Sequence, residues 1–173
     1  MKFTSQLSKE DGSDIYHWFF PIENEIAETF IEGVDKRVIC SVNSQVTYHC
    51  AIHANGASGY RIMLNKSQCY KLLVRGEIIN IELGKDRSEY GVPIGDELRE
   101  VLDQNPDADK IFHALTKGRQ RTLIYWTNNV KSTDIKIRRS LVMTDHLVHQ
   151  NGNTDCKLLN VEMKAANQAA KLD

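Results

Sequence analysis

The chain has 173 residues, of which 41% are hydrophobic and 26% charged, as in an ordinary globular protein and unlike a disordered one. Its formal net charge of -1 gives no overall excess that would point to nucleic acid or to a membrane surface. No apolar run is long enough to cross a bilayer, and the first residues lack the apolar stretch of a signal peptide. We therefore expect a cytoplasmic protein with no membrane partner.

The first half of the chain predicts mainly β-strands. Apolar and polar residues alternate over residues 3–7 and 77–83, the pattern of half-buried strands. Val46–Ala54 and Tyr60–Leu64 flank a glycine-containing loop, which predicts a hairpin. Residues 65–73 fit one helix of two turns. Several short strands around one or two short helices predict a small closed or half-closed barrel, which would protect the strand edges.

The second half predicts helices. Apolar residues recur at helical spacing in a segment that Pro106 ends and again over residues 108–115. A later helix, capped by Ser132 or Thr133 and ended by Gly152, carries an apolar stripe that includes Ile137, Leu141 and Val148. Because such short helices are not stable alone, we expect their stripes to pack against one another or against the barrel. Residues 156–173 have a weak apolar face and predict a loosely docked helical tail.

Metal-ligating and nucleophilic residues give no site. In a strand, Cys50 faces opposite to His49 and His53, and those two histidines lie roughly 13 Å apart, too far for one metal. His146 and His149 have helical i, i+3 spacing, but we identify no third ligand and interpret the pair as structural. Phosphate-loop and nucleophile-elbow motifs do not occur. We expect no catalytic residue, no metal and no other cofactor.

Charge is distributed unevenly along the second half. Six acidic residues occur from Asp96 to Asp109, and seven basic ones follow. The candidate anion-binding or partner-binding residues are Lys117, Arg119, Arg121, Lys131, Lys136, Arg138 and Arg139. Such a cluster could follow nucleic-acid phosphates, with Tyr125 or Trp126 available for stacking. The alternative is that the acidic and basic helices are neighbours and neutralise each other, which the near-zero net charge favours.

Four segments carry a family resemblance: residues 92–98 (VPIGDEL), 108–115, Tyr125-Trp126 and 131–139. They resemble the YdeI/OmpD-associated family, often labelled bacteriocin-protection proteins. The residues that fit its pattern are Phe112, Leu115, Tyr125, Trp126, Lys131, Arg138 and Arg139. Residues 71–86 resemble the end of a small barrel domain of unknown function that often precedes this module. That domain resembles a double-split β-barrel, an architecture shared with dimeric DNA-binding regulators.

These observations together predict an α+β protein with a double-split-type β-barrel followed by a helical bundle. The expected parts are the barrel domain at residues 1–88, the YdeI/OmpD-associated domain at 89–152 and the helical tail at 153–173. The resemblance implies no known catalysis and no cofactor, and its family name implies a role in stress or bacteriocin resistance. We therefore favour a non-enzymatic cytoplasmic binding protein whose partner is a protein or a nucleic acid. The alternatives are a nucleic-acid-binding regulator that uses the basic cluster and an enzyme with an unrecognised pocket. A homodimer is one assembly that the barrel resemblance allows.

Overall fold

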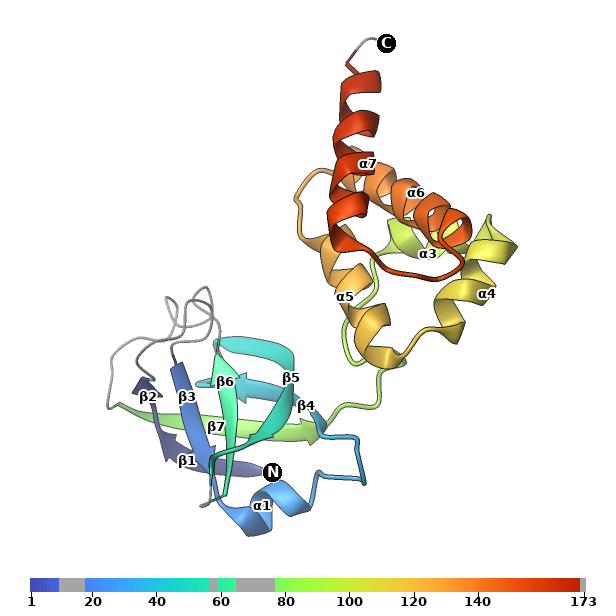
Figure 1. Cartoon of the computed structure of the whole chain (residues 1–173). Coiled ribbons are helices and arrows are strands. Elements are labelled where there is room, and N and C mark those ends of the chain that lie inside the picture. Colours follow the sequence, from blue (N-terminus) through green and yellow to red (C-terminus); the bar gives the residue numbers. More distant parts are fainter. Residues whose placement is uncertain (10–17, 57–58, 65–76, 172–173) are drawn as a thin grey trace. The chain divides into compact units, whose positions relative to one another are not determined.

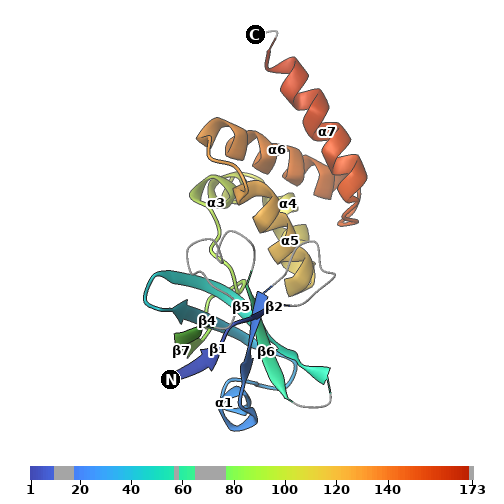
Figure 2. The same cartoon turned by 90° about the vertical axis from the view of Figure 1, so that its left-hand side faces the viewer.

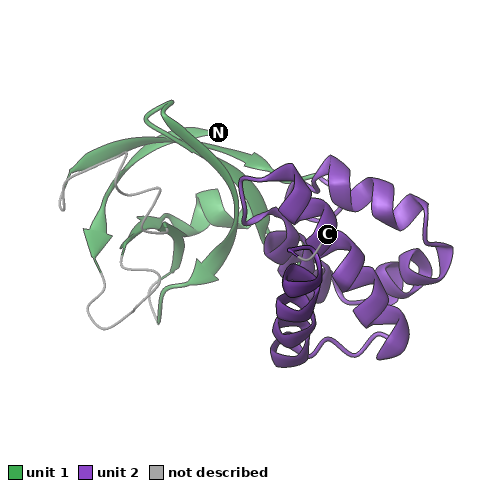
Figure 3. Cartoon of the chain, turned by 90° about the horizontal axis from the view of Figure 1, so that it is seen from above, with its two compact units in different colours: residues 1–87 green, residues 88–173 purple. Residues whose placement is uncertain are grey.

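The computed structural model describes residues 1–9, 18–56, 59–64 and 77–171. Strands occupy the first part of the chain and helices the second (Figure 1 and Figure 2). The chain divides into two compact units, residues 1–87 and 88–173, each with its own hydrophobic core (Figure 3). This arrangement confirms the predicted α+β class with a barrel first and helices second. None of the helices in the described ranges has the length and hydropathy that a membrane span requires.

The first unit is a nearly closed antiparallel barrel. Its elements in chain order are β1 Lys2–Gln6, β2 Ser8–Lys9, β3 Trp18–Ile22, α1 Asn24–Glu28, β4 Arg37–Val42, β5 Val46–Ala54, β6 Tyr60–Leu64 and β7 Ile78–Lys85. The seven strands follow the order β1-β7-β4-β5-β6-β3-β2. The Ser5 hydroxyl of β1 donates to the Pro21 carbonyl of β3 at 2.8 Å. This bond joins β1, the first strand in that order, to β3 and nearly closes the sheet.

The alternation of apolar and polar residues along the strands determines which side chains form the barrel core. Ile79, Ile81 and Leu83 of β7 are all buried, and the polar residues between them face outward. β4 and β5 meet at Asn43 and Ser44, which both have positive φ, as a tight turn between right-twisted strands requires. The hairpin predicted for Val46–Ala54 and Tyr60–Leu64 is confirmed, because β5 and β6 pair antiparallel. The helix predicted for residues 65–73 lies outside the described residues.

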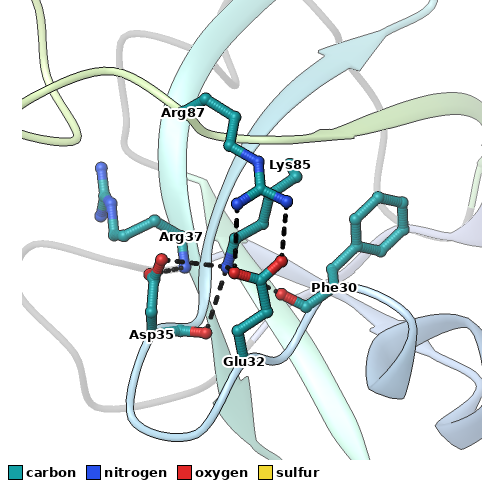
Figure 4. Close-up of polar contacts among 6 residues, drawn as sticks. All are labelled: Phe30, Glu32, Asp35, Arg37, Lys85 and Arg87. Atoms are coloured by element: carbon teal, nitrogen blue, oxygen red, sulfur yellow. Dashed lines mark hydrogen bonds and ion pairs between the residues drawn. The ribbon is translucent and has the colours of Figure 1, made fainter.

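A polar cluster holds the loop before β4 against the end of β7 (Figure 4). The Lys85 ammonium donates to the carbonyls of Phe30 and Asp35 and lies 3.0 Å from the Asp35 carboxylate. Arg87 pairs with both carboxylate oxygens of Glu32, at 2.9 and 3.3 Å. The Arg37 backbone N–H and, second, Lys85 lower the pKa of Asp35. The cluster therefore fixes the barrel up to its last residue, Arg87.

The second unit is helical. Its helices are α3 Asp96–Asp103, α4 Pro106–Ala114, α5 Lys117–Asn128, α6 Thr133–His149 and α7 Cys156–Ala169. Pro106 opens α4 at a position where its missing N–H leaves no bond unmade. Gly152 has a φ of +79°, and its N–H bonds to the Leu147 carbonyl and so ends α6. Phe112, Leu123, Ile124, Met143 and Leu147 are at most 2% exposed and form the centre of this core.

Candidate functional site

The seven candidate basic residues lie in two groups at opposite ends of α5. Lys117 and Arg119 are exposed in the first turn of α5, and Arg121 lies one turn further along. Lys131 lies beyond the other end of α5, and the remaining three follow on α6. A helix of this length spans about 18 Å. The structure therefore does not bring the candidate residues together as one compact cluster.

Two residues of the first group, Lys117 and Arg121, make contacts within the helical unit. The Lys117 ammonium lies 5.2 Å from the centre of the Tyr90 ring, within cation–π range. The Arg121 guanidinium donates to the Tyr90 carbonyl at 3.3 Å. Arg119 is exposed, and its backbone N–H is capped by the Thr116 hydroxyl. Exposed positive charge thus remains at the start of α5.

In the second group, Lys136, Arg138 and Arg139 all make contacts within the helical unit. Lys136 pairs with Glu97 of α3 at 3.2 Å, so one acidic and one basic helix do neutralise each other at this point. The pKa of Glu97 is lowered, first by a bond from its own backbone N–H and then by Lys136. Arg138 donates to the Asn167 amide oxygen of α7 at 2.9 Å. Arg139 donates to the Trp126 carbonyl, and its guanidinium lies 5.1 Å from the centre of the Trp126 ring. All of these contacts are made within the helical unit.

The apolar stripe predicted for α6 does not face the core, so that prediction is wrong. Ile137, Leu141 and Val148 are 40%, 46% and 40% exposed. The buried face of α6 carries instead Ser140, Met143, Thr144, His146 and Leu147. The hydroxyls of Ser140 and Thr144 donate to backbone carbonyls within α6, which removes most of the cost of burying them. Their small size lets the other helices approach this face.

Three exposed apolar residues of α6 lie on one side of the helix, and we call them the α6 stripe: Ile137, Leu141 and Val148. They stand at i, i+4 and i+11 and therefore share one side of the helix. Asp134 and Asp145 are exposed beside it, each three or four residues from a member of the stripe. The stripe is thus apolar with an acidic border. Sequence periodicity found these residues but assigned them to the core.

The histidines are held by neighbouring groups. Nδ1 of His146 lies 2.7 Å from the Glu162 carboxylate, and its Nε2 accepts the Asp155 backbone N–H at 3.3 Å. Both ring nitrogens are therefore occupied by protein atoms. On β5, Nδ1 of His49 lies 2.8 Å from the buried Asp86 carboxylate. Among the described residues, no group of three or more His, Cys, Asp or Glu side chains is arranged to hold a metal ion.

The predicted facing of β5 is confirmed. Cys50 is buried in the barrel, and His49 and His53 lie on the outer side. A contact with the Cys40 thiol and, second, burial raise the pKa of Cys50, which disfavours the reactive thiolate. Burial, followed by the nearby cations Arg61, Arg37 and Lys36, lowers the pKa of His53.

Tyr90, His113 and Asp109 form a chain of polar contacts in the helical unit. The Tyr90 hydroxyl lies 2.9 Å from Nε2 of His113, and Nδ1 of His113 lies 3.0 Å from the Asp109 carboxylate. Burial and, second, the neighbouring Glu89 raise the pKa of Tyr90 to about 12. Tyr90 is therefore held in its neutral form, which opposes a role as a nucleophile or a general base near neutral pH.

We predict that one of the six tyrosines titrates near pH 12 and that Tyr90→Phe removes that step from an ultraviolet absorbance titration. The raised pKa means that the folded state binds the phenolic proton more tightly than the unfolded state. The resulting stabilisation is fully present below about pH 10 and is lost as the pH rises through 12. Tyr125→Phe, at an exposed position of α5, is the matched control and should leave the step in place. A step that survives in Tyr90→Phe would contradict the assignment.

The described residues line hollows on the barrel and between two of the helices. One of about 660 Å³ lies on the outer side of the barrel and is lined mainly by polar side chains, among them Thr4, Ser41, Asn43 and Asn80. Another, of about 330 Å³, lies between α6 and α7 and is lined by Val142, Asp145, His146, His149, Glu162, Ala165 and Ala166. Neither hollow is lined by Tyr90, His113 or Asp109.

Sequence reasoning missed the residues of α7 that contact α5 and α6. Asn160, Glu162 and Asn167 each bond a side chain of those helices. Leu159 and Met163 of α7 are buried, at 3% and 7% exposure. Asp155, which caps the first turn of α7, and the i, i+4 spacing of Leu159 and Met163 were the available signals.

Comparison with known proteins gives one family. No curated protein and no solved structure matches the chain. Residues 92–149 match the model of the bacteriocin-protection, YdeI or OmpD-associated family, a segment that spans α3 to α6 and ends where α6 ends. The resemblance read from the sequence is thereby confirmed for this segment, and the function of the family is unknown. The chain therefore carries a YdeI/OmpD-associated domain at residues 92–149.

Proposed function

We propose that this chain is a non-enzymatic cytoplasmic protein that acts in stress or bacteriocin resistance by binding another protein through α6. The family match supports the link to resistance. The α6 stripe is the observation that carries the binding role, because three large apolar side chains on one side of one helix are 40% to 46% exposed. Apolar surface gathered in this way marks interaction sites more often than scattered exposed residues do.

The chemistry of the α6 stripe defines the partner. Ile137, Leu141 and Val148 would pack against an apolar ridge, for example one side of a helix. The exposed carboxylates of Asp134 and Asp145 border this surface and favour basic side chains beside that ridge. The proposed partner is accordingly a protein segment with apolar residues at helical spacing and Lys or Arg next to them.

A protein partner agrees better with the contacts of the cations than a nucleic acid does. Lys136, Arg138 and Arg139 of α6 are all engaged within the helical unit. A duplex would require several free cations on one face. The α6 stripe instead presents apolar groups and carboxylates, and carboxylates repel phosphates.

We predict that Leu141→Glu abolishes function and leaves the fold intact. The new carboxylate would lie at the centre of the α6 stripe and lose its hydration on complex formation, which is unfavourable for an unpaired charge. The position is 46% exposed, so the free energy of unfolding of the variant without its partner should lie within about 0.5 kcal/mol of that of the parent. The measurement is the survival of a deletion strain, complemented with each variant, under bacteriocin and envelope stress.

Val161→Glu is the matched control for this experiment. Val161 is 60% exposed on α7, outside the α6 stripe, and should tolerate the same substitution. We expect the parent and Val161→Glu to restore resistance and Leu141→Glu to fail. Equal rescue by all three proteins would reject the α6 stripe as the functional surface. An unchanged phenotype on deletion would reject the resistance role itself.

The first turn of α5 favours a second candidate, a nucleic-acid-binding regulator. Lys117 and Arg119 are exposed there, no acidic residue shares the turn, and a helix N-terminus attracts phosphate. This candidate predicts binding of duplex DNA or single-stranded RNA that weakens steeply with salt and weakens further in Arg119→Ala. Fluorescence anisotropy at low and near-physiological salt measures both effects. Absence of binding at low salt would eliminate it.

A further inference from the structure

Helix α7 is held to α5 and α6 by few apolar contacts. Leu159 and Met163 are its buried residues, four positions apart, so they form one short apolar edge. Val161 is 60% exposed, and residues 168–171 are exposed throughout. The C-terminal end of α7 projects away from the other helices in both views (Figure 1 and Figure 2). Elements with so little buried apolar surface open at a lower free energy than the core does.

Polar contacts supply the rest of the attachment. The Trp126 indole donates to the Asn160 amide oxygen at 3.4 Å, and Arg138 donates to that of Asn167 at 2.9 Å. His146 contacts Glu162 at 2.7 Å. We call Trp126, Arg138, Val142 and His146, the residues of α5 and α6 that face α7, the α7-binding face. Trp126 and Arg138 of this face are donors to acceptors on α7, and Nε2 of His146 accepts the Asp155 N–H at the start of α7.

The packing of α7 on this face is incomplete. An open hollow of about 330 Å³ lies between Val142, His146 and His149 of α6 and the small side chains of Ala165 and Ala166, and the carboxylates of Asp145 and Glu162 also line it. A larger side chain at position 165 or 166 would fill part of this open hollow and add dispersion contacts with the α6 side chains that line it. A helix with the same anchors and larger residues at these two positions would fit the face better than α7 does.

The family match includes α6 but not α7. It ends at residue 149, the last residue of α6, so α7 lies wholly outside the matched segment. The α7-binding face, in contrast, lies entirely within it. A surface of the matched segment is thus covered by a helix that the match does not include.

We propose that the α7-binding face is a site for a helix of a second protein, and that α7 covers it in the free chain and is displaced on binding. The partner helix carries two apolar anchors four residues apart, acceptors at the positions of Glu162 and Asn167, and a bulky apolar residue where α7 has Ala165 or Ala166. This surface is separate from the α6 stripe, since Arg138, Val142 and His146 occupy another side of α6. The inference therefore stands or fails independently of the proposed function.

The test uses a fluorescent peptide of residues 156–171 in which Cys156 is replaced by Ser and Ala165 and Ala166 by Leu. Its binding to the full-length chain is followed by anisotropy. We expect weak binding to the parent, because α7 competes at a high effective concentration. Met163→Ala in the full chain removes one anchor of α7 and leaves the α7-binding face intact. Peptide affinity should then rise by about tenfold or more, as the fraction of open protein rises.

Further variants keep the test decisive. Asn167→Ala removes one polar contact of α7 and should raise the affinity for the peptide less than Met163→Ala does. This variant still tests the proposal if Met163→Ala does not fold. A peptide that also carries Leu159→Glu and Met163→Glu should not bind. Leu141→Glu in the full chain should leave peptide binding unchanged, which separates this site from the α6 stripe.

Three results would overturn the proposal. The first is an affinity that does not increase when α7 is loosened, since α7 would then not cover the site. The second is equal binding of the peptide without anchors. The third is dimerisation of the full-length Ala165→Leu, Ala166→Leu variant, measured by size exclusion with light scattering, since the occupant would then be a second copy of this chain. We expect that variant to remain monomeric.

Discussion

Replacement of Phe112 by alanine is expected to lower the free energy of unfolding of the helical unit by about 3–5 kcal/mol. Phe112 is fully buried, and its ring makes edge-type contacts with the rings of Tyr90 and His113 at centroid distances of 5.8 and 5.4 Å. Truncation removes those contacts together with the apolar burial and leaves a cavity between α4 and its neighbours. The Gln120 side chain would keep its bond to the residue 112 carbonyl, so the loss is one of packing.

The two tryptophans make this prediction measurable. Trp126 reports on the helical unit and Trp18 on the barrel, and each lies beside a different core cluster. Urea unfolding of Phe112→Ala, followed in Trp18→Phe and Trp126→Phe backgrounds, should shift the helical transition and not the barrel transition. Tyr125→Ala, at an exposed position, should shift neither by more than about 0.5 kcal/mol. A barrel transition that moves with Phe112→Ala would show that the two cores are energetically coupled.

His146→Leu is expected to destabilise the helical unit by about 1–3 kcal/mol and to release α7 in particular. The side chain of His146 is completely buried, and its loss leaves the Asp155 N–H and the Glu162 carboxylate without the imidazole. Glu162 is 32% exposed and can recover hydration, so the expected loss of stability is smaller than for a fully buried ion left without its partner. Hydrogen exchange should accelerate in α7 more than in α6.

His149→Leu is the control for this substitution. His149 is exposed on the next turn of α6, whereas the bond to the Asp155 N–H at the start of α7 comes from His146. Its replacement should change the unfolding free energy by less than about 0.5 kcal/mol and leave the α7 amides as protected as in the parent. Equal acceleration across α6 and α7 in His146→Leu would mean that α7 opens only when the whole unit unfolds.

The strands were predictable because one face of each is buried and the other is not. In β7, the alternation of Ile79, Ile81 and Leu83 with polar residues is visible in the sequence and is what the barrel buries. Helix α6 shows the opposite case. Its buried side contains Ser140, Thr144 and His146, whose polar groups bond locally or to α7, and hydropathy cannot reveal such compensation. The apolar residues that periodicity singled out are those left exposed.

The basic residues were predictable as a group along the chain but not in space. The length of α5 separates Lys117 from Lys131, and the partners of the others come from distant segments. Lys136 pairs with Glu97, 39 residues away, and Arg138 with Asn167, 29 residues away. Such pairings depend on helix packing, which spacing within one helix does not specify. The binding role of this group therefore stays a prediction.

The most direct test of the account is site-specific photo-cross-linking in living cells from position 141, in the centre of the α6 stripe. The account predicts a cross-link to a discrete protein that disappears with Ile137→Glu in the same chain, and no such product from position 161 on α7. A cross-link to nucleic acid, or a pattern that is the same at positions 141 and 161, would contradict a protein-binding role of the α6 stripe.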